Sequence, residues 1–81
     1  MNTEEIFDKV RAAFVTVLDH DNFELREETT ANDVDGWESI THMMIISEIE
    51  KSFDIKFKLM DLMNMNNVGD LIATIKSELQ S

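Results

Sequence analysis

The segment Asp35-Gly36-Trp37-Glu38-Ser39-Ile40-Thr41-His42, residues 35–42, marks the main structural boundary of the chain. It separates a segment without hydrophobic periodicity from one in which apolar residues recur at helical spacing. Gly36 gives the backbone extra freedom just before this change, and serine is a residue type favoured at helix N-caps. We therefore expect a long loop to end, and a helix to begin, at Ser39.

The helix that follows is predicted to run from Ser39 to about Ser52, since no helix breaker interrupts it. One broad arc should face the core, and it contains Met43, Ile45, Ile46, Ile49 and Phe53. A second stripe should face away from the core, and it contains Ile40, Met44, Ser47 and Lys51. Apolar residues exposed near a helix start indicate a docking surface.

Upstream of this helix, an amphipathic helix is predicted from about Thr3 to Leu18. Its apolar residues fall within one arc: Ile6, Phe7, Val10, Ala13, Phe14, Val17 and Leu18. Asn2 and Glu5 have the spacing of a capping box. The following loop, 19–38, is unusually long, and its expected anchors in the core are Phe23, Leu25 and Val34.

Downstream, the segment from Leu59 to Met65 has room for at most one or two helical turns. Asn66 or Asn67 should then cap a last helix, whose apolar stripe contains Val68, Leu71, Ile72, Ile75 and Leu79. No strand is needed. The expected fold is all-α, a four-helix bundle of three main helices and one short helix with a long first loop, in a single domain of residues 1–81.

The composition limits the possible functions. The 81 residues include no cysteine, which excludes disulfides and thiolate metal sites, and the net charge of -10 disfavours nucleic acid and anionic lipid as partners. No apolar run is long enough to cross a bilayer, and the opening Met-Asn-Thr-Glu-Glu lacks the features of a signal peptide. We expect a cytoplasmic monomer.

Catalysis by this chain alone is not expected. The two histidines, His20 and His42, have no nucleophile and orienting acid arranged with them, and His42 is better explained as a partly buried polar residue near a helix start than as a general base. A calcium loop with Gly36 at its sixth position would place Ala31 and His42 at its ends, where carboxylates are required. No metal site is therefore predicted.

Ser39 is the residue with the clearest chemical potential. Taken alone, a serine at this position is most simply a helix cap. A phosphodiester on its hydroxyl would, however, lie at the positive end of a helix, where backbone N–H groups favour an anion.

The surrounding sequence favours the second interpretation, because Ile6 to Leu79 resembles the acyl and peptidyl carrier protein family. Residues 35–42 resemble its G-x-D-S-L motif, in a variant with tryptophan before the acid-serine pair. Residues 49–57, I-E-K-S-F-D-I-K-F, resemble the L-E-E-x-F-D-I-x-I end of its second helix. Residues 66–71, N-N-V-G-D-L, resemble the T-T-V-G-D opening of its last helix. The three blocks keep the family's spacing without a gap.

The resemblance implies that Ser39 accepts a 4′-phosphopantetheine arm from coenzyme A through a magnesium-dependent phosphopantetheinyl transferase. The arm's thiol would carry an acyl, aminoacyl or polyketide group as a thioester between partners such as a ligase, ketosynthase or acyltransferase. The helix starting at Ser39 would recognise these partners, and the expected recognition residues are Trp37, Glu38, Ile40, Thr41, Met44, Ser47 and Lys51. A cargo pocket beneath that helix would be lined by Met43, Ile46, Ile49, Leu62 and Met63.

The sequence departs from the family at three places. Glu38 replaces the usual aspartate before the serine. Thr41, Met44 and Lys51 stand where acids are common, and the short third segment exposes Leu59 and Met60 instead of carrying a proline. These departures indicate a dedicated carrier of a secondary or envelope pathway rather than the housekeeping fatty-acid carrier.

An alternative hypothesis is an unmodified adaptor that keeps the carrier fold. Such a protein would bind partners through Ile40, Met44 and Trp37 and would never acquire the arm.

Overall fold

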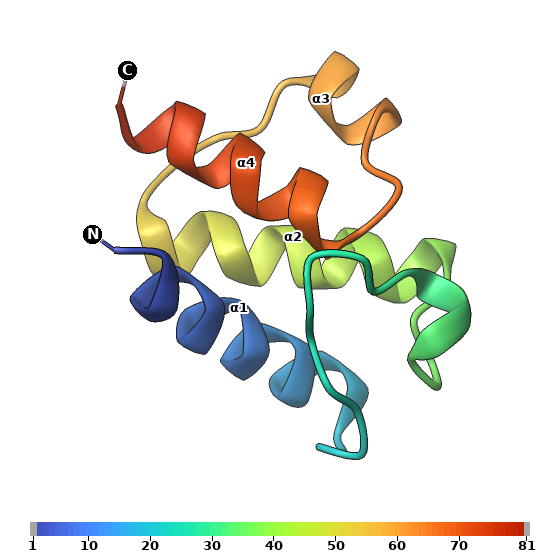
Figure 1. Ribbon diagram of the computed structural model, residues 1–81. Helices are drawn as coiled ribbons and strands as arrows, with labels where there is room; N and C mark the ends of the chain where they lie inside the picture. The colour runs from blue at the N-terminus through green and yellow to red at the C-terminus, as the bar shows by residue number, and fades with distance from the viewer. Residues whose placement is uncertain (1, 81) are drawn as a thin grey trace.

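A computed structural model describes residues 2–80, which form four α-helices and one short 3₁₀ turn with no strand among them. In chain order these are α1 (Thr3–Leu18), the 3₁₀ turn η1 (Ala31–Asp33), α2 (Ser39–Phe53), α3 (Leu59–Met63) and α4 (Val68–Leu79). The prediction of an all-α, four-helix fold with a long first loop is confirmed. Figure 1 shows α1, α2 and α4 packed together, with the short α3 at one side.

The ends of α1 and α4 follow from short polar side chains at their caps. The Asn2 side chain accepts a hydrogen bond from the Glu5 N–H at 2.8 Å, and α1 ends where Asp19 adopts a left-handed conformation with φ 59°. Asn67 accepts from the Asp70 N–H at 2.8 Å. Asn2 and Asn67 each satisfy a backbone donor that the helix leaves without an internal partner. The two helices therefore begin where the sequence predicts.

The start of α2 differs from the prediction in one respect. Glu38 is the N-cap residue, with an extended backbone, and Ser39 is the first residue inside the helix. Because Ser39 does not serve as the cap, its side chain is not committed to the backbone of its own helix turn.

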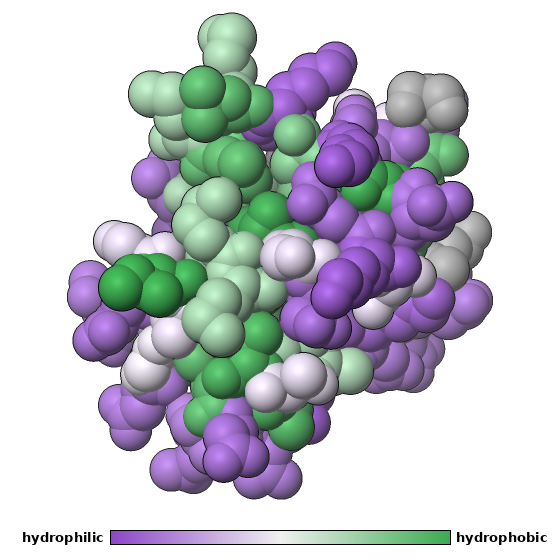
Figure 2. All heavy atoms as spheres, turned by 180° about the vertical axis from the view of Figure 1, so that it is seen from behind, coloured by the Kyte–Doolittle hydropathy of each residue, from purple (hydrophilic) through white to green (hydrophobic). Residues whose placement is uncertain are grey.

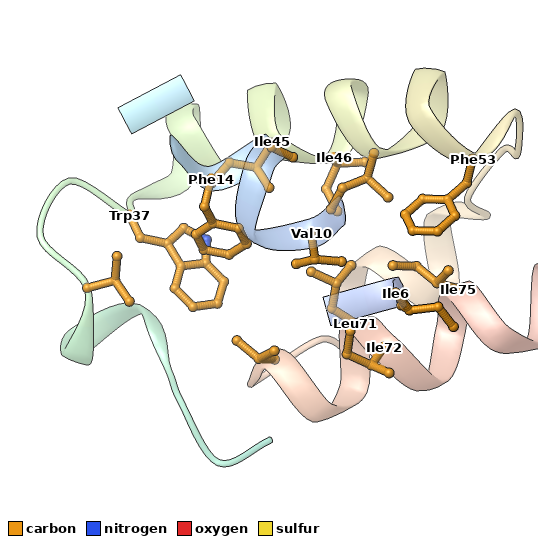
Figure 3. Close-up of a cluster of buried hydrophobic side chains, with 14 residues drawn as sticks. Ile6, Val10, Phe14, Trp37, Ile45, Ile46, Phe53, Leu71, Ile72 and Ile75 are labelled. Atoms are coloured by element: carbon orange, nitrogen blue, oxygen red, sulfur yellow. The ribbon is translucent and has the colours of Figure 1, made fainter. Parts of the chain in front are cut away.

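The core lies between α1, α2 and α4. Figure 3 shows Phe14 and Val10 of α1 facing Ile45 and Ile46 of α2, with Leu71 and Ile75 of α4 closing the cluster. The fully buried large side chains are Phe14, Ile6, Ile45, Ile49, Leu71, Ile75, Val10 and Val68.

Met43 does not join this core, contrary to prediction. Its side chain is 53% exposed, whereas Ile46 is 2% exposed. At about 100° per residue, Met43 lies beyond the edge of the arc centred on Ile45, Ile46 and Ile49, so the predicted arc was too broad. Leu79, at the end of α4, is also exposed.

The long loop is fixed to the start of α4, as Figure 1 shows where it crosses that helix. The Val68 N–H donates to the Thr29 carbonyl at 2.9 Å, and the Gly69 N–H donates to the Glu27 carbonyl at 2.8 Å. A Cβ at Gly69 would lie 3.0 Å from the Glu27 carbonyl oxygen, so glycine permits this close approach. The predicted anchors Phe23 and Leu25 are half-buried and Val34 is buried.

Candidate functional site

Ser39 lies in the first turn of α2 with an exposed side chain. The first intrahelical hydrogen bond of α2 runs from the His42 N–H to the Glu38 carbonyl at 2.7 Å. The preceding N–H groups of the helix therefore have no carbonyl partner one turn earlier, and they give this end a partial positive charge. Within residues 2–80 no hydrogen bond occupies the Ser39 hydroxyl, which leaves its oxygen accessible to a modifying enzyme.

Thr41 fixes the loop that precedes Ser39. Its hydroxyl accepts a hydrogen bond from the Glu38 N–H at 2.7 Å and donates to the Gly36 carbonyl. Gly36 has a φ of 87°, a left-handed conformation that other residues rarely adopt. Thr41, which the sequence predicts to contact partners, therefore also has a structural role, because its hydroxyl holds Gly36 and Glu38 in place before Ser39.

Replacing Thr41 by valine should test that task. Valine has a similar shape but cannot bond to Glu38 or Gly36, so we expect the free energy of unfolding to fall by about 1 kcal/mol. Amide hydrogen exchange should accelerate at residues 36–38 while the α4 amides stay protected. Unchanged exchange at those residues would show that Thr41 does not hold the loop. Ser47→Ala, an exposed α2 substitution, is the control.

Trp37 is buried, which corrects the prediction that it contacts partners. Its side chain is only 7% exposed, and its ring meets Phe14 edge to face with centroids 4.9 Å apart. Figure 3 shows it beside Phe14 at the end of the core. The sequence neighbours of Trp37 are exposed, but a large aromatic ring gains more from burial than from solvent contact.

The buried ring of Trp37 also holds His42. The indole Nε1–H donates to His42 Nδ1 at 3.0 Å. His42 is half-buried, and burial lowers the pKa of its imidazole below the ordinary value. The interpretation of His42 as a partly buried polar residue agrees with this geometry.

A hollow of about 530 Å³ opens beside Ser39. It lies between the start of α2, the 3₁₀ turn and the residues at the start of α4, and its lining is Ala31, Trp37, Glu38, Ser39, His42, Met65, Asn66, Asn67 and Leu71. Apolar and amide side chains are mixed in this lining. The hollow therefore has both apolar surface and hydrogen-bonding groups within reach of anything attached to Ser39.

None of the residues predicted to form a cargo pocket lines this hollow. Ile46 and Ile49 are buried in the core, Leu62 is half-buried, and Met43 and Met63 are exposed. The packing of α2 against α1 uses the isoleucines to fill the interior, so they do not border open space. The lining residues Met65, Asn66 and Asn67 were missed as site residues, because only the fold brings them close to Ser39.

An exposed apolar face accompanies the site. We define it by three residues of α2 and three of α3: Ile40, Met43, Met44, Leu59, Met60 and Met63, which are each at least 50% exposed. Figure 2 shows apolar atoms in a continuous band bordered by hydrophilic residues on the side opposite the view of Figure 1. The predicted exposure of Ile40, Met44, Ser47 and Lys51 is confirmed. No acidic residue occurs in 39–47.

Other kinds of site find no support among residues 2–80. No group of three or more histidine, cysteine or carboxylate side chains is arranged to hold a metal ion there. In the same part of the chain, the helices are too short or too polar to cross a membrane.

Known proteins share both the sequence pattern and the fold. A family model described as "Phosphopantetheine attachment site" matches residues 8–75. The acyl carrier protein of Streptococcus thermophilus is 36% identical over 73 residues, which cover 90% of this chain and 95% of the relative. That of Thermotoga maritima is 30% identical over 76 residues, 94% of each chain. The solution structure of a holo acyl carrier protein from Geobacter metallireducens superimposes with a TM-score of 0.84 at 39% identity, covering 93% of this chain and 86% of the other.

Proposed function

Because this chain belongs to the acyl carrier protein family, whose members are carriers with a covalent 4′-phosphopantetheine and not catalysts, we propose that Ser39 holds the arm. The observation that carries the proposal is the exposed, uncommitted Ser39 hydroxyl in the first turn of α2, beside an open hollow. Three features support the proposal: the Ser39 oxygen is accessible, it lies at the positive end of the helix, and there is open space beside it.

The residues around Ser39 suit the chemistry of the arm. A phosphodiester on the hydroxyl would lie at the positive end of α2, where the first N–H groups have no carbonyl partner one turn earlier and favour an anion. The amide groups of pantetheine would find hydrogen-bonding partners in the hollow, where Asn66 and Asn67 contribute to the lining. When bound, the group supplies a thiol that carries cargo as a thioester.

The proposal is tested by incubating the protein with coenzyme A, magnesium and a broad-specificity phosphopantetheinyl transferase. The intact mass should rise by one phosphopantetheine group, and it should stay unchanged when the transferase is omitted. If the mass stays unchanged with an active transferase, verified on a second carrier protein, the proposal fails and the unmodified-adaptor hypothesis gains.

We further propose that the partners are the enzymes of a specialised pathway, such as a dedicated ligase, ketosynthase or acyltransferase. The support is the exposed apolar face together with the lack of acids in 39–47. Enzymes of fatty-acid synthesis present basic surfaces to their carriers, and basic groups are not complemented by methionine and isoleucine. A partner that fits this face has an apolar surface of its own.

The double variant Met44→Glu, Lys51→Glu should shift partner choice. Both residues are exposed, so the fold should tolerate the acids. We expect a fatty-acid ketosynthase to use the holo double variant with a kcat/KM roughly threefold or more above its kcat/KM for the original holo protein. The reason is that the added acids attract a basic surface. The control Met44→Gln, Lys51→Gln should give a smaller change. If the original holo protein already gives the same kcat/KM as a standard fatty-acid carrier in this assay, the specialised role is wrong.

A further inference from the structure

The contact between Trp37 and His42 determines which ring nitrogen of His42 carries a proton. An indole N–H can only donate a hydrogen bond, and it donates here to His42 Nδ1 at 3.0 Å. Nδ1 must therefore present a lone pair. The neutral imidazole then has its proton on Nε2, and this tautomer is fixed by the buried tryptophan.

The Nε2–H group of His42 is free to bind something else. Within residues 2–80, the His42 side chain makes a single hydrogen bond, the one from Trp37. No buried side-chain nitrogen or oxygen in that range lacks a partner, so the unpartnered Nε2 is reached by solvent. His42 and Ser39 both line the same hollow. A donor of fixed tautomer thus borders the space beside the attachment residue.

The spacing along α2 brings this donor near whatever is bonded to Ser39. Residues three apart on a helix are neighbours on its surface, with Cβ atoms about 5–6 Å apart. The first group beyond the Ser39 oxygen would be a phosphodiester, whose two non-bridging oxygens carry the negative charge and accept hydrogen bonds. A neutral N–H donor to such an anion gives a bond stronger than one between two neutral groups.

We propose that His42 is a positioning residue for the arm: with Nδ1 held by Trp37, its Nε2–H donates to the phosphodiester on Ser39. This inference rests on the proposed attachment at Ser39. The bond would direct the first part of the arm into the hollow rather than out into solvent. Glu38, the one charged side chain in the lining, does not take part, because a carboxylate cannot donate to a phosphate.

The test compares apo and holo protein by NMR, using histidine labelled with stable isotopes. In the apo protein, burial holds the pKa of His42 below its ordinary value. A phosphodiester beside the ring stabilises the protonated form, so the His42 pKa should rise by about 0.5 or more in the holo protein. His20 bonds to the Asp35 carbonyl and the Asn22 N–H instead, so its ring signals at one fixed pH should have the same chemical shifts in both forms.

Phosphorus NMR of the holo protein provides a second readout. A phosphodiester does not titrate between about pH 5 and 8, so a change in its chemical shift in that range reports a neighbouring histidine. The holo protein should show this change with the same midpoint as His42. Holo His42→Gln, which keeps an amide N–H but does not titrate, should show none.

The outcomes separate the two proposals. If the arm is present on Ser39 by mass, but His42 titrates alike in both forms and the phosphorus signal does not change, the positioning role is wrong and the attachment proposal stands. If the arm does not attach, or still attaches to Ser39→Ala, both proposals fall.

Discussion

Ser39→Ala is expected to abolish the gain of phosphopantetheine mass completely. The transferase forms a bond to a hydroxyl oxygen, and alanine provides none. The fold should be unaffected, since the N-cap of α2 is Glu38 and the neighbouring loop is held by Thr41. The variant should therefore have the circular dichroism and unfolding midpoint of the original protein while remaining at its apo mass under conditions that load the original fully.

Ser52→Ala is the matched control for this experiment. Ser52 is an exposed serine near the far end of the same helix and is not among the expected recognition residues, so its loss leaves the helix start intact. It should load as fast as the original protein. Loading of Ser39→Ala, even if slow, would assign the arm to another hydroxyl and contradict the account.

Phe14→Ala is expected to have the largest effect on stability. The Phe14 side chain is fully buried, and its ring contacts Phe23 at 5.9 Å and Trp37 at 4.9 Å between centroids. Truncating a buried phenylalanine costs about 3–5 kcal/mol, whereas whole domains are stable by about 5–15 kcal/mol and small ones have the smallest cores. Urea unfolding should show the midpoint displaced to much lower concentration, with part of the protein unfolded in buffer.

The same substitution should weaken the site, because Phe14 supports the ring of Trp37 and that ring holds His42. Phe7→Ala is the control on the same helix, since Phe7 is half-buried and lies at the edge of the core. Its cost should be well below that of Phe14→Ala. Equal costs for the two variants would mean that the core is not centred where the structure places it.

The helices were predictable because their signals are local. Asn2 and Asn67 mark helix starts by residue type, and the apolar period of α1 and α4 identifies the faces that pack. The ordering of the long loop was less predictable. Hydrogen bonds from the N–H groups of Val68 and Gly69 join the loop to a helix about forty positions further along the chain, and no local pattern predicts such pairing.

The proposed attachment residue Ser39 could be named from the sequence, whereas most of its surroundings could not. The resemblance of residues 35–42 to a carrier motif leads directly to Ser39. Trp37 was misjudged because its neighbours in sequence are exposed, while its ring turns into the core beside Phe14. The hydrogen bond from Trp37 to His42 joins the loop before α2 to the first turn of that helix. A spacing of five residues does not predict such a contact. The lining by Met65 and Asn66 depends on how α3 and α4 are joined.

Attachment of the arm to Ser39 can be tested by locating the added mass within the protein. Trypsin cleaves after Arg26 and Lys51, which releases residues 27–51 as one peptide. This peptide contains five hydroxyl side chains: Thr29, Thr30, Ser39, Thr41 and Ser47. Fragmentation of the peptide from loaded protein should place one phosphopantetheine on Ser39. Its location on any other residue, or its absence from this peptide in loaded protein, would contradict the account.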